Sequence, residues 1–324
     1  MRKIRLEHKS EVLDSLELEW WDKNALMIEK IWKFDDFLSR IIRRRYIKRS
    51  QKFLLGEKKQ VKVLELGCGS GWVGQFFASK NIFIHGTDFS PNQVALAKKN
   101  AELAGKQRYT SYEIADSTNS NFDTSEYDAV LLHAFIHHLD QPEFDNLFRG
   151  TLSTMKSGTK FWFYEPTHVE TSETTNISGN NSKLRIAAMI LGNKTVNAIS
   201  YVARRLKLND QLLKNQFETE TKIALQNGWY FSPKEIPIES EGFTQILRSN
   251  GITINDSYWA TGFLIGWANC VALLKNPKLR RLLSNLLIRP LAILDNWIIS
   301  DTEFMNTIMK PPSYAFRVWE CVKD

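Results

Sequence analysis

Three glycines at alternate positions follow a short apolar run near residue 63. The segment Val63-Leu64-Glu65-Leu66-Gly67-Cys68-Gly69-Ser70-Gly71 passes from aliphatic residues into these glycines, and Trp72 to Ser79 then suits a helix. Glycine permits a tight turn and lets a ligand approach the backbone closely at the N-terminus of a helix. The pattern therefore predicts a strand, a ligand-binding loop and a helix.

An acidic residue follows at the spacing that a nucleoside site requires. Asp88 comes at the end of the next strand candidate, Asn81 to Thr87, about 20 residues after Gly67. At that separation a carboxylate can accept both hydroxyls of a ribose. The dinucleotide fingerprint G-x-G-x-x-G places its third glycine where this chain has the bulky Trp72, which argues against a dehydrogenase.

The motifs around this loop resemble those of class I, Rossmann-like methyltransferases that use S-adenosylmethionine, in particular the branch that acts on small molecules. The runs ELGCGSG, GTDFSP, ADS and YDAVLLH occur in the family's order between Val61 and Pro166. The resemblance implies S-adenosylmethionine as the cofactor. The cofactor-binding residues it implies are Glu65, Gly67 and Gly69 at the methionine end, with Cys68 and Gly71 in the same loop, Asp88 at the ribose, Phe89 against the adenine, Asp116 and Ser117 beside the adenine amino group, and His133 under the reacting methyl.

Three histidines and a glutamate are candidates for the chemistry. His137 and His138 follow the fourth strand candidate, Glu165 ends the fifth, and His168 begins the segment after it. Methyl transfer mainly requires alignment of nucleophile and methyl, and a histidine near an acceptor hydroxyl can act as a general base. We therefore name His137, His138 and His168 as catalytic candidates, although a His-His run after a strand can also simply start a helix. We expect no metal site, because His133 ends a strand and has no ligand cluster around it.

Strand and helix patterns alternate from residue 61 to 165, which indicates a parallel sheet covered on both faces. By the resemblance, Ile252 to Trp259 is the sixth strand and Tyr314 to Val322 the closing antiparallel seventh. We expect an α/β fold with a seven-stranded, mostly parallel Rossmann-like sheet, helices on both faces and a largely helical cap. The expected divisions are an N-terminal helical cap (1–58), the cofactor-binding core (59–166), a helical insertion (167–230), a core helix and sixth strand (231–260), an amphipathic helical insertion (261–312) and the closing strand (313–324).

The two insertions follow strands five and six, whose loops open at the carboxyl edge of the sheet, where ligands bind in such folds. They could cover the active site and so suit a sizeable or water-excluded substrate. In the second insertion Leu282, Leu286 and Trp297 belong to an apolar stripe. We favour packing of this stripe against the cap; the alternative is peripheral contact of residues 275–299 with a membrane surface.

The net charge is +7, and three basic stretches lack acids, at 39–55, 174–209 and 275–290. Solvated helix faces would explain them, as would an anionic or lipid-like acceptor, a membrane surface or nucleic acid. Nucleic acid is disfavoured because His133-Ala134-Phe135-Ile136 lacks the Asn/Asp-Pro-Pro-Tyr/Phe signature. Three distant cysteines suggest a reducing compartment such as the cytoplasm. The apolar run Gly262 to Leu274 is shorter than the roughly 18–20 residues that cross a bilayer.

Three functions follow from these observations. The leading one is methyl transfer from S-adenosylmethionine to an oxygen or carbon of a small-molecule, lipid-like or glycan-linked acceptor. The second is a nucleic-acid methyltransferase, and the third is a non-catalytic subunit that binds the cofactor in support of a partner.

Overall fold

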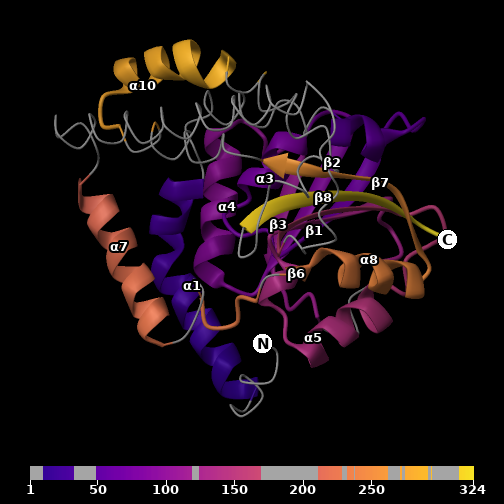
Figure 1. Cartoon of the computed structure of the whole chain (residues 1–324). Coiled ribbons are helices and arrows are strands. Elements are labelled where there is room, and N and C mark those ends of the chain that lie inside the picture. The colour runs from indigo at the N-terminus through magenta and orange to yellow at the C-terminus, as the bar shows by residue number, and fades with distance from the viewer. Residues whose placement is uncertain are drawn as a thin grey trace, which may run out of the picture.

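A single twisted sheet forms the centre of the molecule. The computed structural model describes residues 10–32, 49–118, 124–168, 211–227, 232–236, 238–261, 271, 274–290, 293 and 314–324. The strands lie in the order β3-β2-β1-β4-β5-β8-β7, with a further strand, β6, paired to β5 (Figure 1). They are β1 (Val61–Leu66), β2 (Ile82–Asp88), β3 (Thr110–Ile114), β4 (Ala129–His133), β5 (Lys160–His168), β6 (Ile238–Glu239), β7 (Ile252–Thr261) and β8 (Tyr314–Lys323).

The predicted α/β fold is confirmed, and the strands expected at 81–87, 252–259 and 314–322 occur as β2, β7 and β8. Strands β1 to β5 pair in parallel, while β8 runs antiparallel to both of its neighbours, β5 and β7. The two-residue β6 was not expected, since so short a pairing leaves no periodic pattern in a sequence.

The two faces of the sheet have separate hydrophobic cores. Successive side chains of a strand point to opposite faces. Val63 accordingly packs in a cluster with Phe77 and Trp162, whereas the next residue, Leu64, packs in a cluster with Phe163. Both residues of β1 are fully buried because helices cover both faces, as in other parallel sheets.

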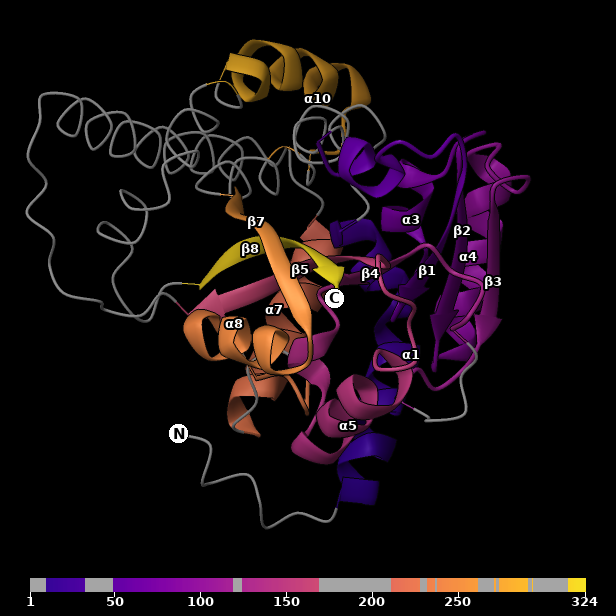
Figure 2. The ribbon, with the colours of Figure 1, turned by 90° about the vertical axis from the view of Figure 1, so that its right-hand side faces the viewer.

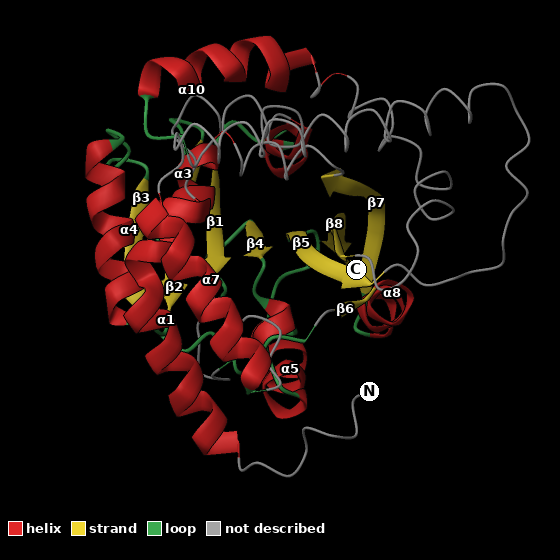
Figure 3. Cartoon of the chain, turned by 60° about the vertical axis from the view of Figure 1, so that its left-hand side comes forward, coloured by secondary structure: helices red, strands yellow, loops and turns green. Residues whose placement is uncertain are grey.

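The helices lie on both sides of this sheet. Figure 2 shows α8 against β7, with α3 and α4 against β2. Helix α1 packs beside α4 and α7 (Figure 3). The α-helices are α1 (Ser10–Trp32), α3 (Trp72–Phe77), α4 (Pro91–Leu103), α5 (Gln141–Asn146), α7 (Gln211–Gln226), α8 (Ser240–Ser249) and α10 (Pro277–Leu283), and shorter turns are the 3-10 turn η2 (Ile136–His138) and the π-turns η3 (Leu147–Thr151) and η4 (Ser284–Ile288).

The last helix of the core differs from the expected one. The sequence indicated a helix from about residue 231, but α8 begins only at Ser240, and residues 232–236 form a turn. Pro233 and Pro237 explain the difference, since a proline inside a helix removes a hydrogen bond and clashes with the preceding turn. This turn contributes to the site described below.

The expected cap is described in part. Helix α1 and the helical residues 49–55 fall in the N-terminal segment, α7 falls in the first insertion, and α10 with η4 falls in the second. Residues 169–210, 262–270 and 294–313 of the two insertions lie outside the described residues, so their part in a cap stays a prediction. Within the described ranges, no helix is both long and apolar enough to cross a bilayer.

Candidate functional site

The loop after β1 has a backbone that only glycine adopts readily. Gly67, Gly69 and Gly71 have positive φ angles of 64°, 52° and 72°. A Cβ atom on Gly67 would lie 2.2 Å from the ring of Phe135, and one on Gly71 would lie 2.8 Å from Tyr112. The loop therefore requires glycine for both its conformation and its close packing.

Asp88, at the end of β2, is joined to this loop. Its Oδ2 accepts the N–H of Gly69 at 2.8 Å, and its Oδ1 accepts the N–H of Ser90 at 3.0 Å. Burial raises the pKa of Asp88 to about 6, so the group is ionised at neutral pH. Each carboxylate oxygen can accept a further hydrogen bond, which suits the predicted role of holding the two ribose hydroxyls.

Glu65 carries a buried oxygen that is unsatisfied within the described part of the chain. Its Oε1 accepts the N–H of Gly74 at 3.1 Å, whereas its Oε2 has no hydrogen-bond partner there. Burial raises the pKa of Glu65 to about 8. An unsatisfied buried carboxyl is unfavourable, and an ammonium group would relieve it. The residues thus fit a cofactor with an amino-acid end.

A cavity of about 680 Å³ opens beside the glycine loop and Asp88. Within the described residues, every predicted cofactor residue except Gly71 lines it, and Gly71 is in the same loop. Burial raises the pKa of the Cys68 thiol well above its usual value, so this cysteine is no nucleophile. Ser117 is buried, and its hydroxyl shares a hydrogen bond of 2.9 Å with that of Thr87. Asp116 is exposed and accepts the N–H of Thr118 at 2.9 Å.

His137 and Glu165 form a buried pair at the carboxyl edge of the sheet. The Nδ1 atom of His137 lies 2.7 Å from Oε2 of Glu165, whose other oxygen accepts the N–H groups of Phe135 and Ile136, both at 2.9 Å. Burial raises the pKa of Glu165 to about 7. Burial, together with the neighbouring His138, lowers the pKa of His137 well below its usual range. The imidazole is therefore neutral, so one of its ring nitrogens carries a lone pair that can accept a hydrogen bond from a ligand in the cavity.

His138 forms a second pair, with a residue of α1. Its Nδ1 lies 3.0 Å from Oε1 of Glu17, and its ring lies 4.0 Å from that of His137. The hydrogen bond and the attraction of Glu17 outweigh burial and raise the pKa of His138. Two adjacent histidines therefore have opposite tendencies, one neutral and one cationic. Such a division is typical of sites where protons move.

The structure describes the side chain of His133 but only the backbone of His168. His133 ends β4, lines the cavity and stacks on Tyr164, with 4.3 Å between ring centroids. The backbone of His168 pairs with Tyr314 at the end of β5. The side chain of His168 lies outside the described residues, so its catalytic role stays a prediction.

Helix α1 forms one wall of the cavity and is attached to the core on two sides. Glu17 accepts the hydroxyl of Ser232 and the backbone N–H of Lys234, each at 2.8 Å. On the other side Asp22 accepts the backbone N–H of Asn92 at 3.1 Å and contacts the hydroxyl of Ser90, the N-cap of α4. The N-terminal segment is thus tied to the loop that follows Asp88.

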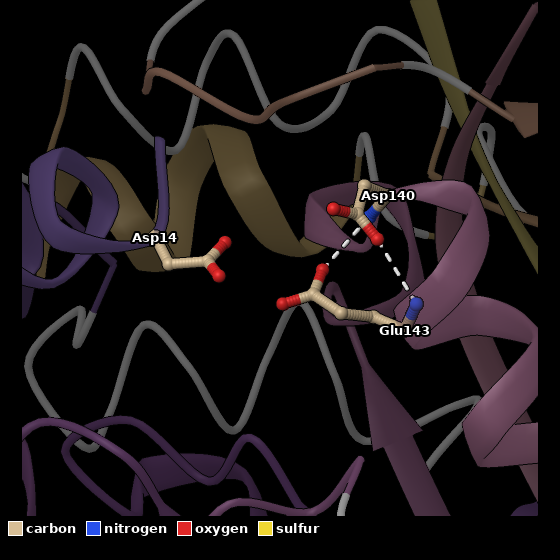
Figure 4. Close-up of side chains that lie close together, drawn as sticks. All are labelled: Asp14, Asp140 and Glu143. Carbon is tan, nitrogen blue, oxygen red and sulfur yellow. Dashed lines mark hydrogen bonds between the residues drawn. The ribbon is translucent and has the colours of Figure 1, made fainter. Parts of the chain in front are cut away.

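Three acidic side chains near α1 lie close enough to resemble a metal site (Figure 4). Asp14, Asp140 and Glu143 each place an oxygen within 4.8 Å of the others. The ammonium of Lys234, however, lies 2.6 Å from Asp14 and also contacts Glu143. Asp140 and Glu143 additionally form a capping box at the start of α5. The cluster is therefore explained by an ion pair and a helix cap.

Comparison with known proteins decides the family to which this fold and site belong. Residues 63–158 match the family model described as a methyltransferase domain. Residues 63–158 therefore form a methyltransferase domain of the class I, Rossmann-fold type that uses S-adenosylmethionine. S-adenosylmethionine is the cofactor of this methyltransferase family, and the glycine loop, Glu65 and Asp88 fit it.

Several named proteins match part of the chain. Ajmaline N-methyltransferase of Rauvolfia serpentina is 32% identical over 88 residues, which cover 27% of this chain and 30% of that protein. Ubiquinone biosynthesis O-methyltransferase of Coxiella burnetii is 25% identical over 101 residues, which cover 31% and 42%. These matches span less than half of either relative. A solved phosphoethanolamine N-methyltransferase 2 of Haemonchus contortus has the same fold, with a TM-score of 0.53 at 14% identity over 94% of this chain and 58% of that one.

Several residues that line the cavity were not predicted from the sequence. They come from α1, from the loop after β4 and from the turn at 232–236, and include Glu17, Trp21, Phe135, Lys234 and Glu235. No local motif indicates them. The one available signal is the proline-bounded run from Pro233 to Pro237, which argues against a helix there.

Proposed function

We propose that this methyltransferase moves the methyl group of S-adenosylmethionine to a hydroxyl oxygen of a small, largely apolar acceptor. The proposal is carried by the buried pair of His137 and Glu165, whose imidazole lines the same cavity as the glycine loop. A hydroxyl is a weak nucleophile at neutral pH and gains from a positioned base. A neutral amine can attack without one.

The pair of His137 and Glu165 favours one type of acceptor atom, on which the relatives differ. One is named an N-methyltransferase and another an O-methyltransferase. A buried, neutral imidazole oriented by a carboxylate favours oxygen over nitrogen. The same base would also serve an acidic C–H group, so carbon is the second acceptor atom that fits.

When bound, S-adenosylmethionine supplies a methyl group activated by its sulfonium. We assign its binding to the residues that the motifs indicated, grouped along the cavity. These are Glu65 with the loop of Gly67, Cys68, Gly69 and Gly71 at the methionine end, Asp88 at the ribose, Phe89, Asp116 and Ser117 at the adenine, and His133 near the methyl.

His137 acts as the general base in this scheme. Glu165 accepts its Nδ1–H and so fixes the tautomer in which Nε2 carries the lone pair. Nε2 would receive the hydroxyl proton as the hydroxyl oxygen takes the methyl group and S-adenosylhomocysteine is left behind. Oε1 of Glu235, 3.9 Å from Nε2, then stabilises the imidazolium that results. The remaining requirement is alignment of the hydroxyl with the methyl, which the walls of the cavity provide.

Aromatic side chains indicate the class of acceptor. Those that line the cavity near the histidines are Trp21, Trp72, Phe135, Tyr164 and Phe316. Aromatic walls bury large apolar groups and leave few polar contacts for a hydrophilic ligand. We therefore favour a lipid-like acceptor over a glycan-linked one.

Turnover by the whole chain tests the proposal. S-adenosylhomocysteine release should appear with an apolar fraction of a cell extract and not with RNA or DNA. His137→Ala should abolish release while leaving S-adenosylmethionine affinity, measured by titration calorimetry, unchanged. The control is His85→Ala, because His85 lies on β2 and bonds Ser111 and Glu113 instead of lining the cavity.

Three outcomes would contradict the proposal. Turnover that survives His137→Ala would exclude this residue as the base. Cofactor binding without turnover on any fraction would favour a non-catalytic subunit, and turnover on RNA or DNA would favour a nucleic-acid enzyme.

A further inference from the structure

Helix α10 and the turn η4 present an apolar surface to solvent. Leu282 of α10 and Leu286 of η4 are 53% and 62% exposed, and Ile293, beyond the end of η4, is 74% exposed, whereas Ser284 and Ile288 are buried. The segment therefore has an inner side that packs and an outer side that does not. In each view α10 lies at the upper limit of the molecule (Figures 1 and 2). We call the outer side, with Leu282, Leu286 and Ile293 and the basic residues around them, the α10 face.

The α10 face is strongly basic. The basic residues of the segment are Lys275, Lys278, Arg280, Arg281 and Arg289, and no acidic residue occurs from 275 to 290. Lys275, Lys278, Arg281 and Arg289 are exposed. Leucine and isoleucine bordered by lysine and arginine is the composition of helices that lie in the interface of a bilayer.

We infer that the α10 face binds the surface of an anionic membrane. Exposed leucines could enter the boundary between headgroups and acyl chains, while the lysines and arginines attract the negative headgroups. Among the described residues no helix is suited to span a bilayer, so the contact would be peripheral.

The positive charge of the α10 face favours an anionic membrane over a second copy of the chain as its binding partner. In a symmetric dimer the same patch meets itself, so the exposed Lys275 and Lys278 of one copy would lie against the same lysines of the other. Like charges across an interface are unfavourable. An anionic lipid surface complements both the charge and the apolar stripe.

The α10 face is separate from the candidate active site. Within the described residues, none of α10 or η4 lines the cavity beside the glycine loop. The inference therefore does not rest on the proposed reaction. A methyltransferase held at a membrane would, however, meet a lipid-like acceptor where it is most concentrated.

Flotation of the full-length protein with vesicles tests the inference. The protein should float with phosphatidylglycerol vesicles and remain unbound with phosphatidylcholine vesicles. Leu282→Asp/Leu286→Asp should lower the bound fraction about tenfold or more, because both apolar contacts are lost and negative charge is added. Leu103→Asp/Leu212→Asp is the matched control, since these leucines of α4 and α7 are 74% and 80% exposed.

Two double charge-reversal variants distinguish attraction at the α10 face from attraction by the positive net charge of the whole protein. Lys278→Glu/Arg281→Glu should weaken binding to phosphatidylglycerol, whereas Lys98→Glu/Lys99→Glu, two exposed lysines of α4, should have little effect. Circular dichroism melting checks that each variant is folded. The inference is overturned if the wild type does not bind phosphatidylglycerol, if both pairs of variants behave alike, or if the aspartate pair dissociates a dimer in sedimentation.

Discussion

Glu17 and His138 join the N-terminal helix to the carboxyl edge of the sheet, with 3.0 Å between Oε1 of the glutamate and Nδ1 of the histidine. Glu17 lies on α1 and His138 ends the turn after β4. The glutamate also holds the turn at 232–236 through Ser232 and Lys234. One buried carboxylate thus holds three segments together around the cavity.

Glu17→Gln should destabilise the fold in a pH-dependent manner. The raised pKa of His138 means that the ion pair contributes fully below the ordinary histidine pKa of 6.5 and is lost as pH rises through the raised value. The lowered pKa of Glu17 means that its contribution is present above 4.5 and lost as pH falls through the lowered value. Near pH 6 the free energy of unfolding should fall by about 3 kcal/mol, because a buried partner is left uncompensated.

Denaturant unfolding from pH 5 to 9 measures this difference. The gap between wild type and Glu17→Gln should narrow toward high pH as His138 loses its proton. Glu19→Gln, an exposed position of the same helix, should show no such trend. A gap that is constant across the range would mean that the carboxylate acts only by accepting hydrogen bonds from Ser232, Lys234 and the indole N–H of Trp21.

Methyl transfer should speed up as pH rises through about 7. Burial raises the pKa of Glu165 to about 7, and only the ionised carboxylate accepts the Nδ1–H of His137 without offering a proton in return. Below that pH the tautomer of His137 is no longer fixed, so kcat should fall. Glu165→Gln should remove this step from the kcat profile and lower kcat by roughly 10²-fold or more.

Nitrogen-15 NMR of His137 gives a readout that does not depend on the acceptor. In wild type above pH 7 the proton should reside on Nδ1, and Glu165→Gln should shift the tautomer equilibrium. If the tautomer and the kcat profile were both unchanged in Glu165→Gln, the glutamate would serve only to hold the N–H groups of Phe135 and Ile136.

Asp88→Ala should lower the affinity for S-adenosylmethionine by about 10–100-fold, which corresponds to losing hydrogen bonds to a charged group. Titration calorimetry on the free enzyme measures it. Asp116→Ala is the matched control, because Asp116 lines the same cavity but is exposed and should matter less. Equal losses in the two variants would remove the special role of Asp88. A melting temperature measured for each separates lost binding from lost structure.

These contacts also show how far the sequence could predict the site. The glycine loop and Asp88 lie at the ends of two adjacent strands, β1 and β2. Because their motif is short and continuous in the sequence, it predicts both where these strands end and which ligand binds there. Lys234 reaches Glu143 and Asp14, and Glu17 reaches Ser232, across large separations in sequence. Such contacts depend on how α1 packs on the core, which no periodic pattern specifies. The histidines were predicted in part. The end of the fourth strand predicted that His137 lies near the ligand, but the sequence did not indicate that Glu165 orients its imidazole.

Gly67→Ala should prevent cofactor binding more than it destabilises the protein. Gly67 has φ +64°, and an added Cβ would lie 2.2 Å from the ring of Phe135, which itself lines the cavity. Phe135 would have to move. It follows Ala134, which has a positive φ angle although it is not a glycine. The backbone N–H of Phe135 is also bonded to Glu165, so a shift of Phe135 would disturb this contact. Affinity for S-adenosylmethionine should fall at least about tenfold, as expected when a close backbone approach is blocked.

Gly105→Ala is the control for this substitution. Gly105 has nearly the same φ, +63°, but no atom lies within 4 Å of an added Cβ. It should lose about 1 kcal/mol of stability from the left-handed backbone alone and keep its cofactor affinity. Thermal unfolding and titration calorimetry of both variants separate the two effects. If Gly67→Ala bound S-adenosylmethionine as tightly as Gly105→Ala does, contact between Phe135 and the loop would not govern access to the cofactor site.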